Sequence, residues 1–98
     1  MRDTESQSEP IPSEFAISVR EDRGSTAVEI SGDLDLAHST EAENAIAEAE
    51  KAEGPIVIDL TDLTFLDSVG VAILLMARGR DRQDGESRLT FIAPRART

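Results

Sequence analysis

The segment that most constrains the fold is the short apolar run from Ile56 to Leu60 within "PIVIDL". Its β-branched residues favour a strand, and a continuous apolar run of this length is typical of a central strand covered on both faces. Segments with helical spacing lie on either side of it. Because strand–helix–strand units close by right-handed crossovers, the later strands should be parallel. The sequence therefore predicts an α/β domain with this strand inside the sheet.

The other expected elements surround this strand. Alternating apolar residues predict strands over 15–19 and 26–31, and the turn "EDRG" between them favours an antiparallel hairpin. The segment "RLTFIA" predicts a last strand. We expect a β-β-α-β-α-β order and one small domain over 14–98, with a mixed β-sheet flanked by helices. The polar residues 1–13, which include two prolines, are expected to form a disordered leader.

Two helices are expected. The first has a core-facing stripe of Ala42, Ala45, Ile46, Ala49 and Ala52. Ser39 or Thr40 is expected to cap it, since Glu43 stands three residues after Thr40 in the capping-box position. The second helix is apolar on all sides over 69–77 and has arginines near its C-terminal end. An apolar outer side indicates burial under another element or contact with a partner.

Composition narrows the classes of function. The 98 residues carry a formal net charge of −10, which disfavours nucleic acid and anionic membrane surfaces. The same charge attracts a basic protein or simply keeps the chain soluble. There is no cysteine, which excludes disulfides and thiolate chemistry and suits a cytoplasmic location. No apolar run reaches the ~20 residues that span a bilayer, and the N-terminus has no signal-peptide pattern.

The stretch "TFLDSVGVAILLMA" places a polar Asp67–Ser68 pair before the second helix. Either residue is a favoured helix cap, which contributes ~1 kcal/mol. Gly70 lies in the first turn, where glycine costs ~1 kcal/mol relative to alanine, so a close approach of another element is expected there.

Ser68 is also a candidate phosphate acceptor. At the start of a helix its hydroxyl would be exposed, and a phosphate would add about −1.5 to −2 charges. The free N–H groups and the helix dipole favour that charge locally. Disruption would then fall on a molecule packed over the serine, and the domain itself would stay folded.

The stretches "SGDLDL" and "PIVIDLTDLTFLDSVGVAILL" resemble the STAS domain, specifically the anti-sigma-factor antagonists of bacteria, over roughly 15–94. The resemblance implies a non-enzymatic module without cofactor or metal. It implies that an anti-sigma-factor kinase phosphorylates Ser68 with ATP, that the unmodified form binds this kinase and frees the sigma factor, and that a PP2C-type phosphatase reverses the modification. Carried over to this chain, the partner-binding residues are Asp33, Asp35, Thr64, Asp67, Ser68, Val69, Gly70, Val71 and Leu74.

Two features depart from that family pattern. Val69 follows the motif serine where another small polar residue is common, so Ser68 is the one hydroxyl in the motif proper. The family usually continues past the last strand into a further helix, which is expected to be missing here because the sequence stops at Thr98. An exposed face would follow, with either a monomer or a weak homodimer.

Other functions stay open at this point. The domain could be a scaffold or sensory STAS module of a stress-signalling complex, or could bind a small ligand. His38, the one histidine, would have to serve any Ser-His-Asp triad, but is expected to be an exposed surface residue. Carboxylates near predicted strand ends could in principle bind Mg²⁺, although polar residues are expected there anyway: Asp33, Asp35, Asp59, Asp62 and Asp67.

Overall fold

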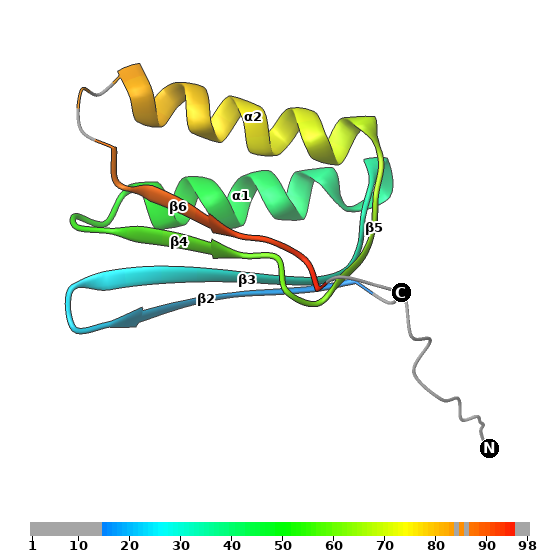
Figure 1. The fold of residues 1–98 in the computed structure, drawn as a ribbon, viewed down its shortest axis with the longest axis horizontal. Helices are drawn as coiled ribbons and strands as arrows, with labels where there is room; N and C mark the ends of the chain where they lie inside the picture. The colour runs from blue at the N-terminus through cyan, green and yellow to red at the C-terminus, as the bar shows by residue number, and fades with distance from the viewer. Residues whose placement is uncertain (1–14, 84, 86, 96–98) are drawn as a thin grey trace.

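The computed structural model describes residues 15–83, 85 and 87–95. The predicted leader over 1–13 lies outside the described residues. The elements, in chain order, are β2 (Ala16–Asp22), β3 (Ser25–Leu34), the 3₁₀ turn η1 (Leu36–His38), α1 (Ser39–Glu50), β4 (Ile56–Asp59), β5 (Leu63–Leu66), α2 (Ser68–Gln83) and β6 (Leu89–Ile92) (Figure 1). Among the described helices, none is long and apolar enough to cross a membrane. The predicted absence of a further helix after β6 stays a prediction, because residues 96–98 are not among the described residues.

The sheet is mixed, as predicted, with strand order β2-β3-β4-β6. The β2–β3 hairpin is antiparallel, and β4 pairs parallel with both β3 and β6. The sequence pattern predicts no strand between β4 and α2. This prediction is wrong, because β5 lies there and pairs with the end of β3. The reason is the length of β3: its ten residues extend past β4, and the bend at Gly32, whose φ is +84°, directs its last residues toward β5.

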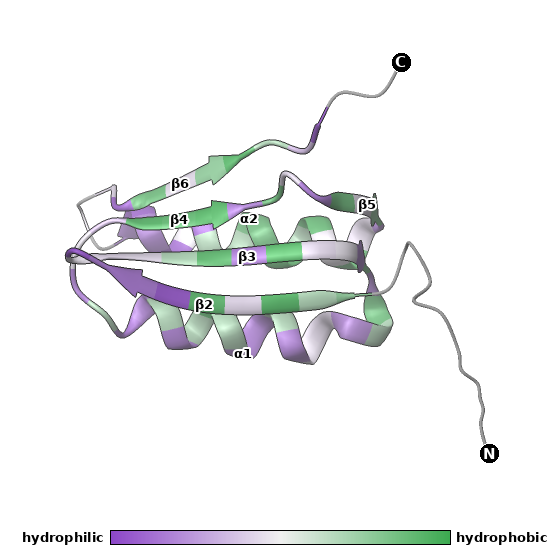
Figure 2. Ribbon diagram, turned by 90° about the horizontal axis from the view of Figure 1, so that it is seen from below, coloured by the Kyte–Doolittle hydropathy of each residue, from purple (hydrophilic) through white to green (hydrophobic). Residues whose placement is uncertain are grey.

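Both helices pack on the same face of the sheet (Figures 1 and 2). Ile56 and Ile58 of β4 are buried beneath them, whereas Val57 and Asp59, which alternate with them, are only half-buried. The prediction that this strand is covered on both faces is therefore wrong. The described domain has two layers, and the second face of the sheet is left open.

The core confirms the expected helical stripe of α1 for four of its five predicted residues. Ala42, Ile46 and Ala49 are buried, and Ala45 packs against the core from its edge. Ala52, the fifth, is half-buried and lies beyond the end of the helix. Alanine side chains are short, so this helix lies close to the sheet. From α2 the core takes Ile73, Leu74 and Ala77, and the strands supply the remaining buried aliphatic residues.

The capping expected for α1 is wrong. The 3₁₀ turn η1 leads directly into the helix, so His38 occupies the cap position and its side chain makes no capping hydrogen bond. The Ser39 hydroxyl donates instead to the Leu36 carbonyl, at 2.9 Å. The backbone turn therefore starts this helix, and the capping box that Thr40 and Glu43 suggest is not formed.

The C-terminal end of α1 is held by a side chain from far along the sequence. The Arg88 guanidinium donates to the carbonyl oxygens of Ala52 and Gly54, at 2.8 and 2.9 Å, and to that of Glu50, at 3.3 Å. The Asp81 carboxylate accepts from the backbone N–H of Arg88, at 2.9 Å. This network joins the ends of both helices to the start of β6.

Candidate functional site

Ser68 is the first residue of α2 and its side chain is exposed. Asp67 caps the helix: its carboxylate accepts from the backbone N–H of Gly70 at 3.0 Å, and its carbonyl accepts from Val71 at 3.0 Å. Of the two residues that the sequence offers as caps, Asp67 therefore does the capping. Within the described residues, no hydrogen bond occupies the Ser68 hydroxyl, which is left facing solvent at a helix N-terminus.

Gly70 is buried where the first turn of α2 meets the end of β3. A Cβ at this position would lie 2.5 Å from the carbonyl oxygen of Leu34 and 2.6 Å from Cδ1 of Leu66. The backbone N–H of Asp67 also reaches the Leu34 carbonyl, at 3.3 Å. The close approach expected from Gly70 is confirmed. It fixes the start of α2, and with it Ser68, next to the end of β3.

Further residues of the predicted site lie at the end of β3 and in β5, next to the start of α2. Asp33 and Leu34 pair in register with Phe65 and Leu66 of β5, directly before α2 begins. The Thr64 hydroxyl donates to the Asp33 carboxylate at 3.0 Å. Asp33, Thr64, Asp67 and Ser68, which are scattered over 36 positions of sequence from 33 to 68, thus belong to one junction of β3, β5 and α2.

His38 is half-buried, so the expectation of an exposed histidine is wrong. Its ring stacks on Phe15, with ring centroids 4.4 Å apart and planes within 6°. Its Nδ1 lies 3.0 Å from the carbonyl oxygen of Asp33 and 2.9 Å from Oδ1 of Asp35. The histidine therefore ties the start of β2 to the loop after β3. This contact joins residues distant in sequence, and no local pattern indicates it.

Exposed apolar side chains surround the junction. Leu36 in η1 is 69% exposed and Phe65 in β5 is 53% exposed, and neither is among the site residues predicted from sequence. Val71, which is predicted, is exposed as well. Regular strand alternation would place Phe65 on the same face as the buried Leu63, so the sequence pattern does not indicate its exposure. The register of β5 on β3 shifts between these two residues, and Phe65 is exposed.

Not every predicted site residue is available to a partner. Gly70 and Leu74 are buried, and Val69 packs against the core. The carboxylate of Asp35 contacts the His38 ring within the domain. The exposed members of the predicted set are Thr64, Ser68 and Val71, in addition to the apolar Leu36 and Phe65 named above.

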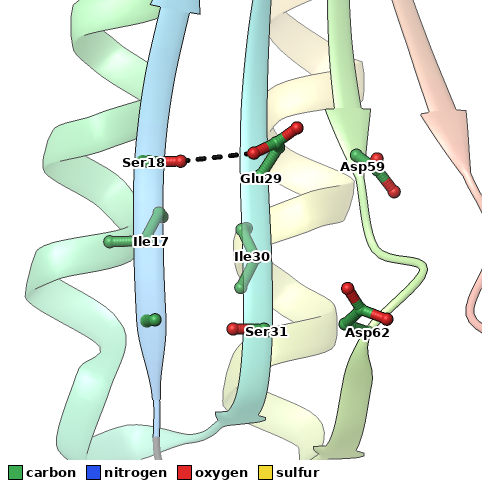
Figure 3. A pocket seen from close by; sticks show the side chains of 8 residues that line it. Ile17, Ser18, Glu29, Ile30, Ser31, Asp59 and Asp62 are labelled. Atoms are coloured by element: carbon green, nitrogen blue, oxygen red, sulfur yellow. Dashed lines mark hydrogen bonds between the residues drawn. The ribbon is translucent and has the colours of Figure 1, made fainter.

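A shallow polar depression lies on the open face of the sheet, away from the helices (Figure 3). Glu29, Asp59 and Asp62 line it. Each is engaged within the domain: Glu29 pairs with Arg20 at 2.6 Å, Asp62 with Arg95 at 3.5 Å, and Asp59 accepts from the backbone N–H of Thr61 at 2.9 Å.

The Mg²⁺ hypothesis finds no matching geometry. The hydroxyl and backbone N–H of Thr61 hold the pKa of Asp59 below its ordinary value. Asp33, Asp35 and Asp67 are not among the residues that line this depression. Within the described residues, no three histidine, cysteine or carboxylate side chains gather in a way that suits a metal ion.

Comparison with known families and structures gives a consistent result. The family model described as "Mlab, STAS domain" matches residues 17–98. An anti-sigma factor antagonist from Mycobacterium paratuberculosis superposes with a TM-score of 0.69 at 27% identity, covering 88% of this chain and 72% of that chain. A search of curated protein sequences gave no significant match.

Two more solved structures share the fold. The antisigma-factor antagonist STAS domain from Rhodobacter sphaeroides has a TM-score of 0.62 at 21% identity, covering 80% of this chain and 85% of that chain. The anti-sigma factor antagonist SpoIIAA in its unphosphorylated form has a TM-score of 0.64 at 24% identity, covering 83% and 76%. With the family model matching most of its length and the mixed sheet bearing two helices on one face, this chain belongs to the STAS domain family.

Proposed function

We propose that this domain is an anti-sigma-factor antagonist, and that phosphorylation of Ser68 switches its binding to an anti-sigma-factor kinase. One observation carries the proposal: the Ser68 hydroxyl is exposed at the start of α2 while Asp67 alone caps the helix. The name of the structural relative at 27% identity supports the same class of function.

The geometry suits a modification that spares the fold. The cap bond from Gly70 to Asp67 does not involve the serine side chain, so a phosphate on Ser68 breaks no hydrogen bond of the described domain. The N–H groups of the first turn and the helix dipole stabilise a negative group placed there. The modified domain should therefore unfold at close to the same temperature as the unmodified one.

The same geometry makes a partner sensitive to the modification. Phe65 of β5 and Val71 of α2 are exposed apolar residues at this junction, and Leu36 is exposed in η1, two residues after β3 ends. Together they give a partner an area to bury. A phosphate among them would have to be desolvated and would lie beside the carboxylate of Asp67. Binding would then be lost without any rearrangement of the antagonist.

The full cycle that we propose needs two further proteins. The kinase would bind the unmodified domain and release its sigma factor, and a PP2C-type phosphatase would restore Ser68. We place this cycle in the bacterial cytoplasm, with the antagonist acting as a non-catalytic monomer or weak homodimer.

The proposal is tested by incubating the protein with its cognate anti-sigma-factor kinase and ATP, and following its intact mass. The parent should gain one phosphate and Ser68→Ala none, while the control Ser18→Ala, an exposed serine on the open face, should be modified like the parent. Ser68→Glu should weaken kinase binding about tenfold or more with an unchanged circular dichroism spectrum. Full modification of Ser68→Ala would overturn the assignment.

A further inference from the structure

The turn η1, between the end of β3 and the start of α1, carries a leucine that the core of the domain does not use. Leu36 is 69% exposed, and no residue of η1 is buried. The turn begins two residues after Leu34, whose carbonyl oxygen accepts from the backbone N–H of Asp67 at 3.3 Å. Leu36 is therefore presented to solvent a short stretch of chain away from the junction that holds Ser68.

A network of polar contacts fixes the conformation of this turn. Nδ1 of His38 lies 3.0 Å from the carbonyl oxygen of Asp33 and 2.9 Å from Oδ1 of Asp35. Both oxygens are acceptors, so Nδ1 carries the ring proton. The backbone N–H of His38 donates to the Asp35 carbonyl at 3.1 Å, and the Ser39 hydroxyl donates to the Leu36 carbonyl at 2.9 Å. The backbone on both sides of Leu36 is thus held in place.

The His38 ring makes the contact in this network that is hardest to replace. Oδ1 of Asp35 is buried and, among the described residues, has no hydrogen bond of good geometry, so the imidazole N–H 2.9 Å away is the group that offsets its burial. The ring also stacks on Phe15, with centroids 4.4 Å apart. Without the ring, the Asp35 carboxylate would turn toward water and η1 would lose its fixed course.

A leucine on a fixed turn is suited to binding. A partner that receives its side chain buries apolar area while little conformational entropy is lost, because the backbone is already ordered. Phe65 in β5 and Val71 in α2 are exposed at the neighbouring junction, so Leu36 is not an isolated apolar residue on the surface. The contacts of η1 therefore serve the presentation of this side chain, since the turn adds nothing to the core.

We propose that Leu36 inserts into an apolar pocket of the anti-sigma-factor kinase and strengthens the complex, with His38 as the positioning residue that holds the leucine outward. This inference rests on the proposed function, because it names a further contact of the same partner. Neither residue belongs to the site predicted from sequence. Their loss should weaken docking and leave the transfer of phosphate to Ser68 unchanged once the complex has formed.

The test of Leu36 measures binding of the unmodified domain to the purified kinase by isothermal titration calorimetry. Leu36→Ala should weaken binding about tenfold, as expected when most of a leucine side chain leaves an apolar contact. Leu75→Ala is the matched control, because Leu75 is 61% exposed and lies seven residues after Ser68, or about 10 Å along the axis of α2. It should change the affinity less than about twofold.

Two results of this experiment would overturn the proposal. The first is a parental affinity in Leu36→Ala. The second is a dimer in sedimentation that Leu36→Ala abolishes, which would assign Leu36 to contact with a second copy of the chain.

The kinetics of Ser68 phosphorylation test the positioning role of His38. His38→Ala should raise KM about fivefold with kcat unchanged, because the contacts that hold Ser68 are separate from those of η1. His38→Asn returns an N–H donor near the place of Nδ1 and should restore most of the parental KM. Circular dichroism spectra check that both variants are folded. An unchanged KM in His38→Ala, or a loss confined to kcat, would contradict this role.

The inference and the proposed switch fail in different ways. If Leu36→Ala and His38→Ala both weaken binding in calorimetry but Ser68 gains no phosphate, the contact stands and the switch is wrong. If Ser68 is phosphorylated and both variants keep the parental affinity, the switch stands and the contact is wrong. A parent domain that binds no anti-sigma-factor kinase would overturn both.

Discussion

The carboxylate of Asp67 accepts a hydrogen bond from the backbone N–H of Gly70 at 3.0 Å, across the first turn of α2. This bond assigns the cap to the aspartate and leaves the neighbouring serine without a role in starting the helix. The helix cap therefore lies on Asp67, and the proposed modification lies on the adjacent Ser68.

That division predicts unequal effects of two substitutions on stability. Asp67→Ala should lower the free energy of unfolding by about 1 kcal/mol, because the N–H of Gly70 loses its partner. Ser68→Ala should change it by less than about 0.5 kcal/mol, as expected for an exposed position. Urea unfolding followed by circular dichroism measures both. If the two effects were equal, the cap would not reside in Asp67.

The two glycines of α2 predict effects of opposite sign. Glycine to alanine within a helix normally stabilises by up to about 1 kcal/mol. Gly79→Ala should do so, because a Cβ there meets nothing within 4 Å. Gly70→Ala should destabilise, since its Cβ would lie 2.5 Å from the Leu34 carbonyl oxygen. Chemical denaturation of both variants checks the prediction, and a stabilised Gly70→Ala would show that α2 does not approach β3 this closely.

Replacing Arg88 should lower the stability of the domain, although the carbonyl oxygens that it contacts lie 34 to 38 residues away in the sequence. Its guanidinium donates to three carbonyl oxygens around the end of α1, and its replacement by methionine would leave them without this donor. Charge-assisted hydrogen bonds of this kind are worth about 1.5–3 kcal/mol, so a loss of about 2 kcal/mol is expected. Lys51→Met, at a side chain that is 75% exposed, is the control and should change stability little. Thermal unfolding compares the two, and equal melting temperatures would contradict the capping role.

The lowered pKa values of Asp59 and Asp81 should make the stability of the domain depend on pH. Hydrogen bonds from Thr61 lower the pKa of Asp59, and the backbone N–H of Arg88 chiefly lowers that of Asp81. A carboxyl group with a depressed pKa in the folded state stabilises the fold at pH values above its ordinary pKa, near 4, and this contribution is lost as the pH falls through the folded value. The melting temperature should therefore decrease below about pH 4.

The Asp59 contribution can be isolated with a variant. Thr61→Val removes the hydroxyl donor, and its melting temperature should depend less steeply on pH below about pH 4 than that of the parent. The same exchange at Thr90, an exposed threonine of β6, serves as the comparison and should retain the parental slope. An unchanged slope in Thr61→Val would mean that this hydrogen bond does not shift the titration of Asp59.

The sequence by itself determined the features that depend on neighbouring residues: the β2–β3 hairpin, the alanine stripe of α1, and the close approach at Gly70. Periodicity and backbone conformation are local properties, and these features can be read from a few residues at a time. Tertiary structure decided which of Asp67 and Ser68 caps the helix, that β5 pairs with the end of β3, that both helices cover one face, and that His38 stacks on Phe15. Each of these depends on contacts between segments far apart in the chain, whose free energies are settled only when the whole domain packs.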